Sequence, residues 1–261
     1  MADYTELSYE VHGYVGIVTL RRPEARNALT RTTYAELEDA VRSTTARCLV
    51  ITGEDPAFCS GDDVKQIMAG ENQDGKLGER LAREPRITPA CDALLHTDVP
   101  IVAAVNGAAV GWGMELALMA DLRVASDKAK FGELFVLRGL NSDVPGLGRL
   151  AQLVGREKAA ELLFTGEVID AAEAARIGLV GRVVAHDELM AVATDLAHRV
   201  ANNPPLAVQA MKRGLRQALD PDWAELGRFV SSSLGELFQT ADHREGVAAF
   251  LEKRAPNYQG R

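Results

Sequence analysis

Residues 106–121 read NGAAVGWGMELALMAD, a mostly apolar run whose second half has the composition of a buried helix. Three glycines, Gly107, Gly111 and Gly113, precede that half, and one acid, Glu115, interrupts its apolar side chains. Glycine lets the backbone turn sharply or approach a ligand closely, and the first N–H groups of a helix point outward without internal partners. Together these features form a site for a negatively charged oxygen.

Glu115 is the second unusual feature of this stretch, because its neighbours are apolar. A buried carboxylate is costly unless it is paired, and its pKa tends to shift. A tight strand-to-helix turn followed by a solvated Glu115 also explains the stretch when it is taken alone. The choice between a functional and a purely structural interpretation therefore depends on the rest of the chain.

Short runs rich in β-branched residues alternate with helical stretches on both sides of this segment. The predicted strands are VGIVTL (15–20), CLVITG (48–53), PIVAAVNG (100–107), DLRVAS (121–126) and LVGRVV (179–184). The predicted helices are TYAELEDAVRS (33–43), with Thr33 and Glu36 at capping-box spacing, MELALMAD (114–121) and REKAAELLFTG (156–166). Strands that alternate with helices indicate an α/β fold with a substantial parallel component.

From about residue 187 the pattern is helical and shows no strand signal. We therefore predict an α/β core over residues 1–190 and a helical region over residues 191–261. Apolar positions at helical spacing in that region suit an oligomer interface or the chain's own core equally. They include Leu226, Phe229, Val230, Leu234 and Leu237.

The composition argues against several classes of function. The 261-residue chain has a net charge of −8 and no basic run of five or more, which argues against a nucleic-acid partner. No stretch approaches 18 apolar residues and the N-terminus lacks a signal-peptide core, so we expect no membrane span. Three cysteines without CxxC spacing fit a reducing compartment, and we expect a cytoplasmic protein.

Three further motifs are ambiguous when each is considered alone. GLGRLA (146–151) has the form of a dinucleotide fingerprint, but no strand precedes it, so we expect no nicotinamide cofactor. FCSGDD (58–63) either exposes backbone donors around Gly61 or is a turn capped by aspartate. Asp143 lies in a loop punctuated by glycine and proline, which is typical of a turn residue. The histidines have no metal-ligand spacing, and we expect no metal site.

Taken together, these stretches resemble the crotonase superfamily, the enoyl-CoA hydratase/isomerase proteins. RRPEARNALT (21–30) resembles the early coenzyme A-contacting segment of that family, AFCSGDDVKQI (57–67) its first oxyanion-hole segment, and residues 100–126 its central signature. FGELFVLRGL (131–140) and the ending FLEKRAPNY (250–258) also fit. The resemblance spans essentially the whole chain and implies a crotonase-type spiral of ββα units with a C-terminal helical region.

The resemblance also implies roles for residues in both glycine turns. The backbone N–H groups of Asp62 and Trp112 would form an oxyanion hole for the thioester oxygen, and the Trp112 indole would narrow the pocket. Glu115 matches the first of the two catalytic glutamates of family hydratases. The usual place of the second is occupied by Phe135, and Glu133, two residues earlier, does not align with it.

Asp143 falls eight positions beyond Phe135, where some relatives, among them dienoyl-CoA isomerases, carry a functional aspartate. The resemblance thus implies a hydratase that adds water to a 2-enoyl-CoA, with Glu115 as a catalytic residue. One alternative is an enoyl-CoA or dienoyl-CoA isomerase that uses Glu115 and Asp143. Another, of a different class, is a non-catalytic acyl-CoA-binding protein.

The binding partners implied by the resemblance are an acyl-CoA substrate and further copies of the chain, as a homotrimer or a dimer of trimers. No cofactor is expected beyond the coenzyme A of the substrate. The residues expected to bind coenzyme A or the substrate are Arg26, Ala28, Leu29, Ser60, Gly61, Asp62, Val64, Gly111 and Phe135.

Overall fold

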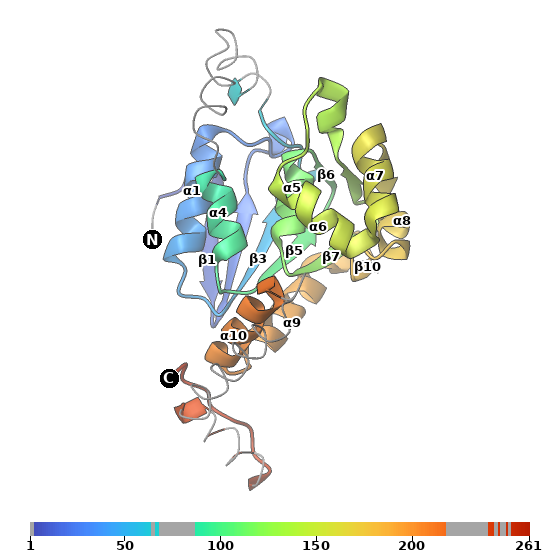
Figure 1. Cartoon of the computed structure of the whole chain (residues 1–261). Helices are drawn as coiled ribbons and strands as arrows, with labels where there is room; N and C mark the ends of the chain where they lie inside the picture. The colour runs from blue at the N-terminus through green and yellow to red at the C-terminus, as the bar shows by residue number, and fades with distance from the viewer. Residues whose placement is uncertain are drawn as a thin grey trace.

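The structure is a computed structural model, and it describes residues 3–63, 66–67, 87–217, 240–242, 245, 249 and 252–261 (Figure 1). Its larger sheet has six strands in the order β1 (Leu7–His12), β2 (Val15–Leu20), β3 (Cys48–Gly53), β5 (Ile101–Val105), β7 (Leu122–Ser126) and β10 (Arg182–Val184). Only the β1–β2 pair is antiparallel among these neighbours. Strands β3 and β5 are buried along their whole length, which explains their continuous apolar sequences.

A second sheet of four short strands packs beside the first. Its order is β4 (Ala57–Cys59), β6 (Ala108–Val110), β8 (Lys130–Gly132) and β9 (Val168–Asp170). The chain passes from β5 to β6 and then into helix α5 (Trp112–Met119). It passes from β7 to β8, through the 3-10 helix η3 (Leu134–Arg138), and into α6 (Val144–Val154). This repeated strand, strand, helix order brings the N-terminal ends of α5 and α6 close to the second sheet.

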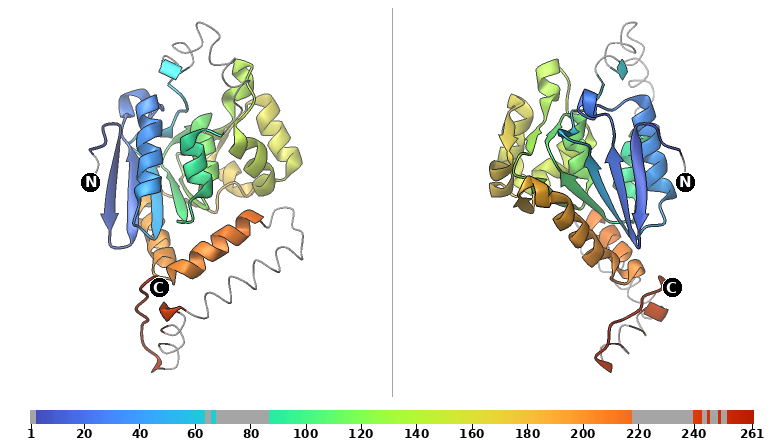
Figure 2. Two further views of the ribbon diagram at one scale, coloured as in Figure 1. Left: turned by 60° about the vertical axis from the view of Figure 1, so that its left-hand side comes forward. Right: turned by 180° about the vertical axis from the view of Figure 1, so that it is seen from behind.

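Helices cover both faces of the larger sheet. On one face, α1 (Arg31–Ser43), α4 (Pro89–His96) and α5 contribute to the main hydrophobic core (Figure 1). On the other, α9 (Leu189–Ala201) packs on β2, β3, β5 and β7 (Figure 2). The remaining elements are α7 (Arg156–Thr165), α8 (Ala171–Arg176), α10 (Pro205–Gln217), and the 3-10 helices η1 (Pro23–Ala25) and η4 (His186–Glu188).

The predicted α/β fold is confirmed, and so are most of the predicted elements. The strands over 15–20 and 48–53 have the predicted bounds, and α7 ends at a glycine, Gly166, with a left-handed φ of 66°. The strand predicted over 179–184 is shorter and begins at Arg182, because Leu179 and Val180 form a buried turn after α8. The predicted boundary after residue 190 falls inside α9, and the division into two regions stays a prediction.

The predicted capping box at Thr33 and Glu36 is wrong. The cap is Thr30, whose hydroxyl accepts from the Thr33 N–H, while the Thr33 hydroxyl accepts from the Thr30 N–H. Glu36 is used elsewhere, because its carboxylate accepts from the N–H groups that begin β1, including those of Glu6 and Leu7. Four donors, three backbone N–H groups and the Thr5 hydroxyl, thus outweigh one N-cap donor for this carboxylate.

Helix α5 is fixed by cations at its C-terminal end. Arg123 donates to the carbonyl oxygens of Ala117 and Ala120, and Arg149 donates to those of Leu118, Met119 and Ala120. Positive charge at this end complements the helix dipole. The opposite end of α5, with its outward N–H groups, is therefore held in one orientation. No helix in the described part of the chain is long and apolar enough to cross a membrane.

Candidate active site

The turns at Gly61 and Gly111 lie against each other. Gly61 has a φ of 89° and Gly111 a φ of 55°, which side-chain-bearing residues rarely adopt. A Cβ atom at Gly61 would lie 3.0 Å from the Val110 carbonyl oxygen and 3.2 Å from the Trp112 nitrogen. The N–H groups of Asp62 and Trp112 follow the two glycines, and neither donates to another described residue. Both are therefore available to an acceptor from outside the chain.

A pocket opens at these two turns. The 3-10 helix η3 forms one wall, while the two glycine turns form the other. Phe135, predicted to contact substrate, is in that wall, and Leu134 and Arg138 join it. The full lining is Ser60, Gly61, Asp62, Gly111, Trp112, Leu134, Phe135 and Arg138. The structure thus brings together six of the residues that the sequence pointed to as oxyanion or substrate contacts.

The segment expected to contact coenzyme A pairs with the first glycine turn through backbone hydrogen bonds. The Leu29 N–H donates to the Gly61 oxygen at 2.9 Å, the Asp63 N–H to the Leu29 oxygen at 2.8 Å, and the Ser60 N–H to the Arg26 oxygen at 3.1 Å. The predicted residues Arg26, Ala28, Leu29 and Ser60 therefore lie in one segment pair beside the pocket. Val64 lies outside the described residues.

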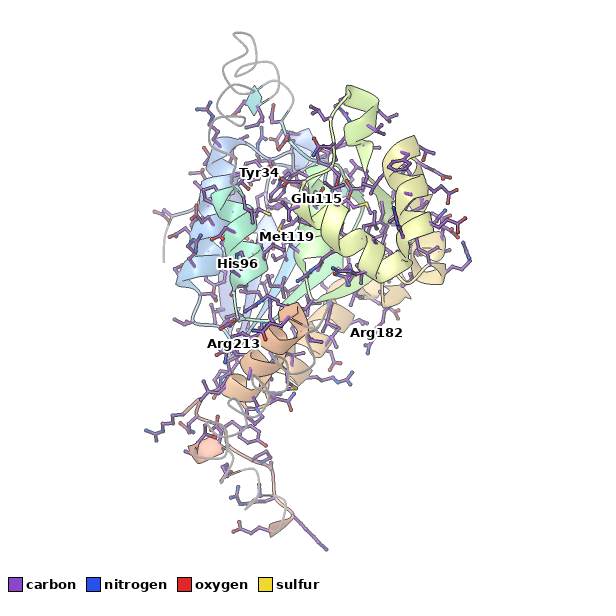
Figure 3. All side chains as sticks on the ribbon, viewed as in Figure 1. Tyr34, His96, Glu115, Met119, Arg182 and Arg213 are labelled. Carbon is purple, nitrogen blue, oxygen red and sulfur yellow. The ribbon has the colours of Figure 1, made fainter. Side chains whose placement is uncertain are left out.

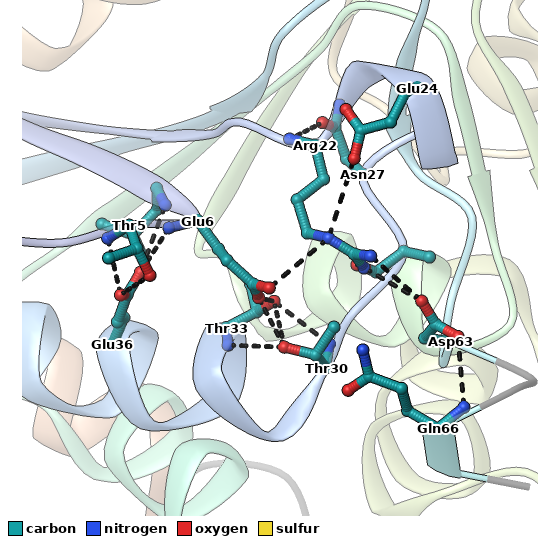
Figure 4. Close-up of polar contacts among 12 residues, drawn as sticks. Thr5, Glu6, Arg22, Glu24, Asn27, Thr30, Thr33, Glu36, Asp63 and Gln66 are labelled. Carbon is teal, nitrogen blue, oxygen red and sulfur yellow. Dashed lines mark hydrogen bonds and ion pairs between the residues drawn. The ribbon is translucent and has the colours of Figure 1, made fainter.

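Side chains brace this segment pair (Figure 4). Asn27, with a left-handed φ of 55°, donates to the carbonyl oxygens of Glu54 and Ala57 at 2.7 Å each and accepts from the Arg22 N–H at 2.9 Å. The Arg22 guanidinium contacts Asp63 at 3.1 Å. Buried hydrogen bonds of this kind fix the backbone, so the N–H of Asp62 is held in place from both sides.

Glu115 is fully buried on α5 (Figure 3) and accepts three hydrogen bonds. Its Oε1 atom accepts from the Ser142 hydroxyl at 2.7 Å and from the Asp143 N–H at 2.8 Å, and its Oε2 atom accepts from the Gly146 N–H at 2.6 Å. Burial raises the pKa of Glu115 to about 7. The three hydrogen-bond donors lower this pKa, and the negative charge of Asp143 raises it. A carboxyl group with that pKa can take or give a proton near neutral pH.

Asp143 is both a turn residue and a neighbour of Glu115. It caps α6, because its Oδ1 atom accepts from the Val144 N–H at 2.7 Å. Its Oδ2 atom accepts from the Trp112 indole N–H at 3.1 Å. The Trp112 ring contacts Tyr34 edge-on with centroids 4.7 Å apart. The backbone N–H of Asp143 contacts Glu115, and the indole holds the Asp143 carboxylate in position.

Tyr34 links α1 to the first glycine turn. Its hydroxyl donates to Asp62 Oδ1 at 2.5 Å. Burial raises the pKa of the Tyr34 hydroxyl well above its ordinary value, and burial also raises the pKa of Asp62, against the hydrogen bond from Tyr34. Tyr34 was not predicted as a site residue, because its position in an ordinary amphipathic helix gives no signal of a polar partner.

Glu133 is the second buried acid near Glu115, and the sequence did not predict this. Only 1% of its surface is exposed, and neither carboxylate oxygen has a hydrogen-bond partner within the described chain. Burial, then the charge of Glu115, raises the pKa of Glu133 to about 9. Phe135, at the position where hydratases are expected to carry their second glutamate, instead lines the pocket.

The loop that holds Glu115 was only partly visible in the sequence. Ser142 and Gly146 were not predicted as site residues, although Gly146 belongs to GLGRLA. That motif lies inside α6 and is not a strand-to-helix turn. Among the described residues, no group of three or more His, Cys, Asp or Glu side chains is placed to hold a metal ion.

Known proteins match the chain over nearly its whole length. The sequence profile of the enoyl-CoA hydratase/isomerase family matches residues 10–261. A probable enoyl-CoA hydratase of Rhizobium meliloti (strain 1021) is 37% identical over 266 residues, covering 99% of this chain and 100% of the relative. A crotonyl-CoA hydratase of Syntrophomonas wolfei subsp. wolfei is 35% identical, covering 98% of each.

The three-dimensional comparison agrees with the sequence comparison. The crystal structure of an enoyl-CoA hydratase from Bacillus anthracis matches with a TM-score of 0.91 at 30% identity, covering 98% of this chain and 100% of that one. The crotonase-type fold predicted from the sequence is therefore confirmed.

Proposed function

The chain belongs to the enoyl-CoA hydratase/isomerase family, and from this premise we propose that it adds water to a 2-enoyl-CoA thioester. The observation that carries the proposal is the placement of two outward N–H groups, from Asp62 and Trp112, at one pocket. Trp112 begins α5, and the buried Glu115 lies three residues further along that helix. The names of the relatives, which include a crotonyl-CoA hydratase, support the same substrate class.

The proposed reaction uses each of these groups once. The thioester oxygen accepts from the N–H groups of Asp62 and Trp112, which stabilise the negative charge that develops there by roughly 3–4 kcal/mol per donor. Glu115 takes a proton from water as the water oxygen bonds to Cβ, and the same proton is then passed to Cα, which restores the Glu115 carboxylate. Since both oxygens of Glu115 are held by loop donors, the carboxylate does not need to reorganise during the reaction.

Coenzyme A is proposed to bind along the segment pair that contains Arg26, Ala28, Leu29 and Ser60. Its thioester would then enter the pocket between the glycine turns and Phe135. We propose that no metal or separate cofactor takes part, that the chain acts in the cytoplasm, and that it assembles as a trimer or a dimer of trimers. Light scattering tests the last point, and a monomer at micromolar concentration would contradict it.

The hydratase proposal is tested by a substrate screen read by mass spectrometry. We expect crotonyl-CoA to gain the mass of one water, and we expect acetyl-CoA to bind with unchanged affinity after treatment with EDTA. Failure of acetyl-CoA to bind, or an absolute need for a divalent ion, would contradict the proposed site. Binding without turnover of any 2-enoyl, 3-enoyl, dienoyl or aryl-acyl thioester would favour a non-catalytic acyl-CoA-binding protein.

An enoyl-CoA or dienoyl-CoA isomerase is the second candidate, because Phe135 is not an acid and Asp143 lies beside Glu115. The variant Asp143→Asn separates the two functions. Asparagine keeps one acceptor oxygen, which can cap α6, but its NH₂ group cannot accept the indole N–H of Trp112. A hydratase that relies on Glu115 alone loses only that contact and should retain at least about a tenth of its kcat. An isomerase that uses both acids should lose about 10²–10⁴-fold.

A further inference from the structure

Glu133 is a buried acid to which the proposed reaction assigns no role. It lies between β8 and η3, its side chain is almost fully covered, and neither oxygen has a partner within the described residues. Most buried polar groups in proteins are hydrogen-bonded, and an unpaired buried carboxylate is among the most costly groups a fold can contain. A side chain in this state therefore needs a physical explanation.

Gly146 shows how close Glu133 lies to Glu115. A Cβ atom at Gly146 would lie 2.8 Å from Glu115 Oε1, 3.0 Å from Glu133 Oε1 and 1.9 Å from Ser142 Oγ. The two carboxyl oxygens are thus separated by no more than the sum of the first two distances. Glycine at this position is what allows both acids and the Ser142 hydroxyl to meet.

The two acids differ in their hydrogen-bond donors. Glu115 accepts from Ser142, Asp143 and Gly146, which stabilise its charged form. Glu133 accepts from none of the described residues and faces the charges of Glu115 on α5 and of Asp143 at the start of α6. The buried Cys91 thiol on α4 faces the same two charges. Among the described residues, the charged groups that act on Glu133 are the acids Glu115 and Asp143.

We propose that Glu133 is a positioning residue of the hydratase site, held as a neutral carboxylic acid, and that its ionisation slows the reaction by opposing the negative charge that develops on the thioester. This inference rests on the proposed function, in which Glu115 acts as an ionised base. While Glu133 is neutral, Glu115 and Glu133 together carry one negative charge. That charge is on Glu115, the acid that accepts three hydrogen bonds.

Loss of the Glu133 proton places a second buried charge beside Glu115. That charge opposes the negative charge that develops on the thioester oxygen. The pKa is about 7 for Glu115 and about 9 for Glu133. Between these two pH values Glu115 is ionised and Glu133 is neutral, so this is the pH range in which we expect the enzyme to be active.

The pH profile of kcat/KM tests the switch, because a merely structural role would not move it. For the wild type we expect an alkaline limb that falls about tenfold per pH unit above about pH 9. The variant Glu133→Gln cannot ionise and should lose this limb. The matched control Glu157→Gln changes an exposed glutamate on α7 and should keep it. An alkaline limb that is the same in Glu133→Gln and in the wild type would overturn the proposal.

Infrared spectroscopy gives a second test that does not depend on turnover. At about pH 8, between the two pKa values, the spectrum should contain the carbonyl band of a protonated carboxylic acid, which disappears above about pH 10. The band should be absent from Glu133→Gln and present in Glu157→Gln. If no such band is seen in the wild type, the proposal is wrong even when hydration is observed. If the band is present but no thioester turns over, the proposed function fails instead.

Discussion

Replacement of Ser142 by alanine should move the acid limb of the pH–rate profile to higher pH. Ser142 donates one of the three hydrogen bonds to Glu115, at 2.7 Å, and this hydrogen bond lowers the pKa of a carboxyl group that burial otherwise raises. The backbone donors from Asp143 and Gly146 are unaffected by the substitution. The Ser142→Ala variant therefore removes one of the three hydrogen bonds that lower the pKa of Glu115.

The size of the effect follows from the charge of the acceptor. A hydrogen bond to a charged group contributes about 1.5–3 kcal/mol, and one pKa unit corresponds to about 1.4 kcal/mol. The pKa of Glu115 should rise by roughly one to two units from about 7. A base acts only when ionised, so the limb moves upward. At pH 7, kcat/KM should fall roughly five- to fiftyfold and recover in part as the pH is raised.

The assay is the hydration of crotonyl-CoA followed across the pH range for the wild type and the variant. Ser126→Ala is a matched control, because Ser126 is also buried and its hydroxyl contacts His186 at 3.0 Å, outside this site. The control should leave the position of the acid limb unchanged. An acid limb in Ser142→Ala at the wild-type position would refute the assignment of that limb to Glu115.

The packing at Gly146 and the helix cap at Thr30 each predict a difference in stability between two substitutions. Gly146→Ala places a methyl group 1.9 Å from Ser142 Oγ. It should lower the free energy of unfolding in urea by about 1–3 kcal/mol and remove most of the turnover. Gly148→Ala, on the same helix, is the control, because its methyl group meets no atom within 4 Å. Equal behaviour of the two variants would contradict the packing described for Gly146. Thr30→Ala removes a helix cap and should lower the free energy of unfolding by about 0.5–2 kcal/mol. Thr32→Ala changes an exposed residue and should leave the free energy of unfolding nearly unchanged. A larger loss for Thr32→Ala than for Thr30→Ala would mean that Thr30 is not the cap.

Several of the longer elements could be predicted from the sequence because their apolar patterns extend over enough residues, although α6 and β1 were not predicted. The apolar run of β3 and the glycines before α5 are examples. Strands β4, β6 and β8 each have three residues, which is too short to show an alternating pattern. They were missed as strands, although their motifs were recognised through the resemblance to a family.

The candidate site shows the same division between local and long-range information. The glycine turns and an acid among apolar residues leave a local signature, whereas the roles of Glu115 and of the N–H groups after Gly61 and Gly111 were implied by the resemblance to a family. The burial of Glu133 beside Glu115 was not predictable. An alignment compares positions along the chain, whereas this burial depends on how η3 and α6 pack. The Thr30 cap was missed because Glu36 is engaged by a strand that lies 24 or more residues earlier.

Glu115→Gln needs one precaution that the structure reveals. Both carboxylate oxygens of Glu115 accept hydrogen bonds, so the amide NH₂ of glutamine must face a donor. Loss of one such contact costs about 1–3 kcal/mol, and the variant should unfold at a lower urea concentration than the wild type. Its fold and its affinity for acetyl-CoA therefore have to be measured beside its activity, with Glu157→Gln as the matched control.

The most direct test of the central claim is the rate of crotonyl-CoA hydration by folded Glu115→Gln. We expect kcat to fall about 10²–10⁴-fold while acetyl-CoA binds with wild-type affinity, because an amide cannot take a proton from water. A kcat equal to that of the wild type would contradict the assignment of Glu115 as the catalytic base.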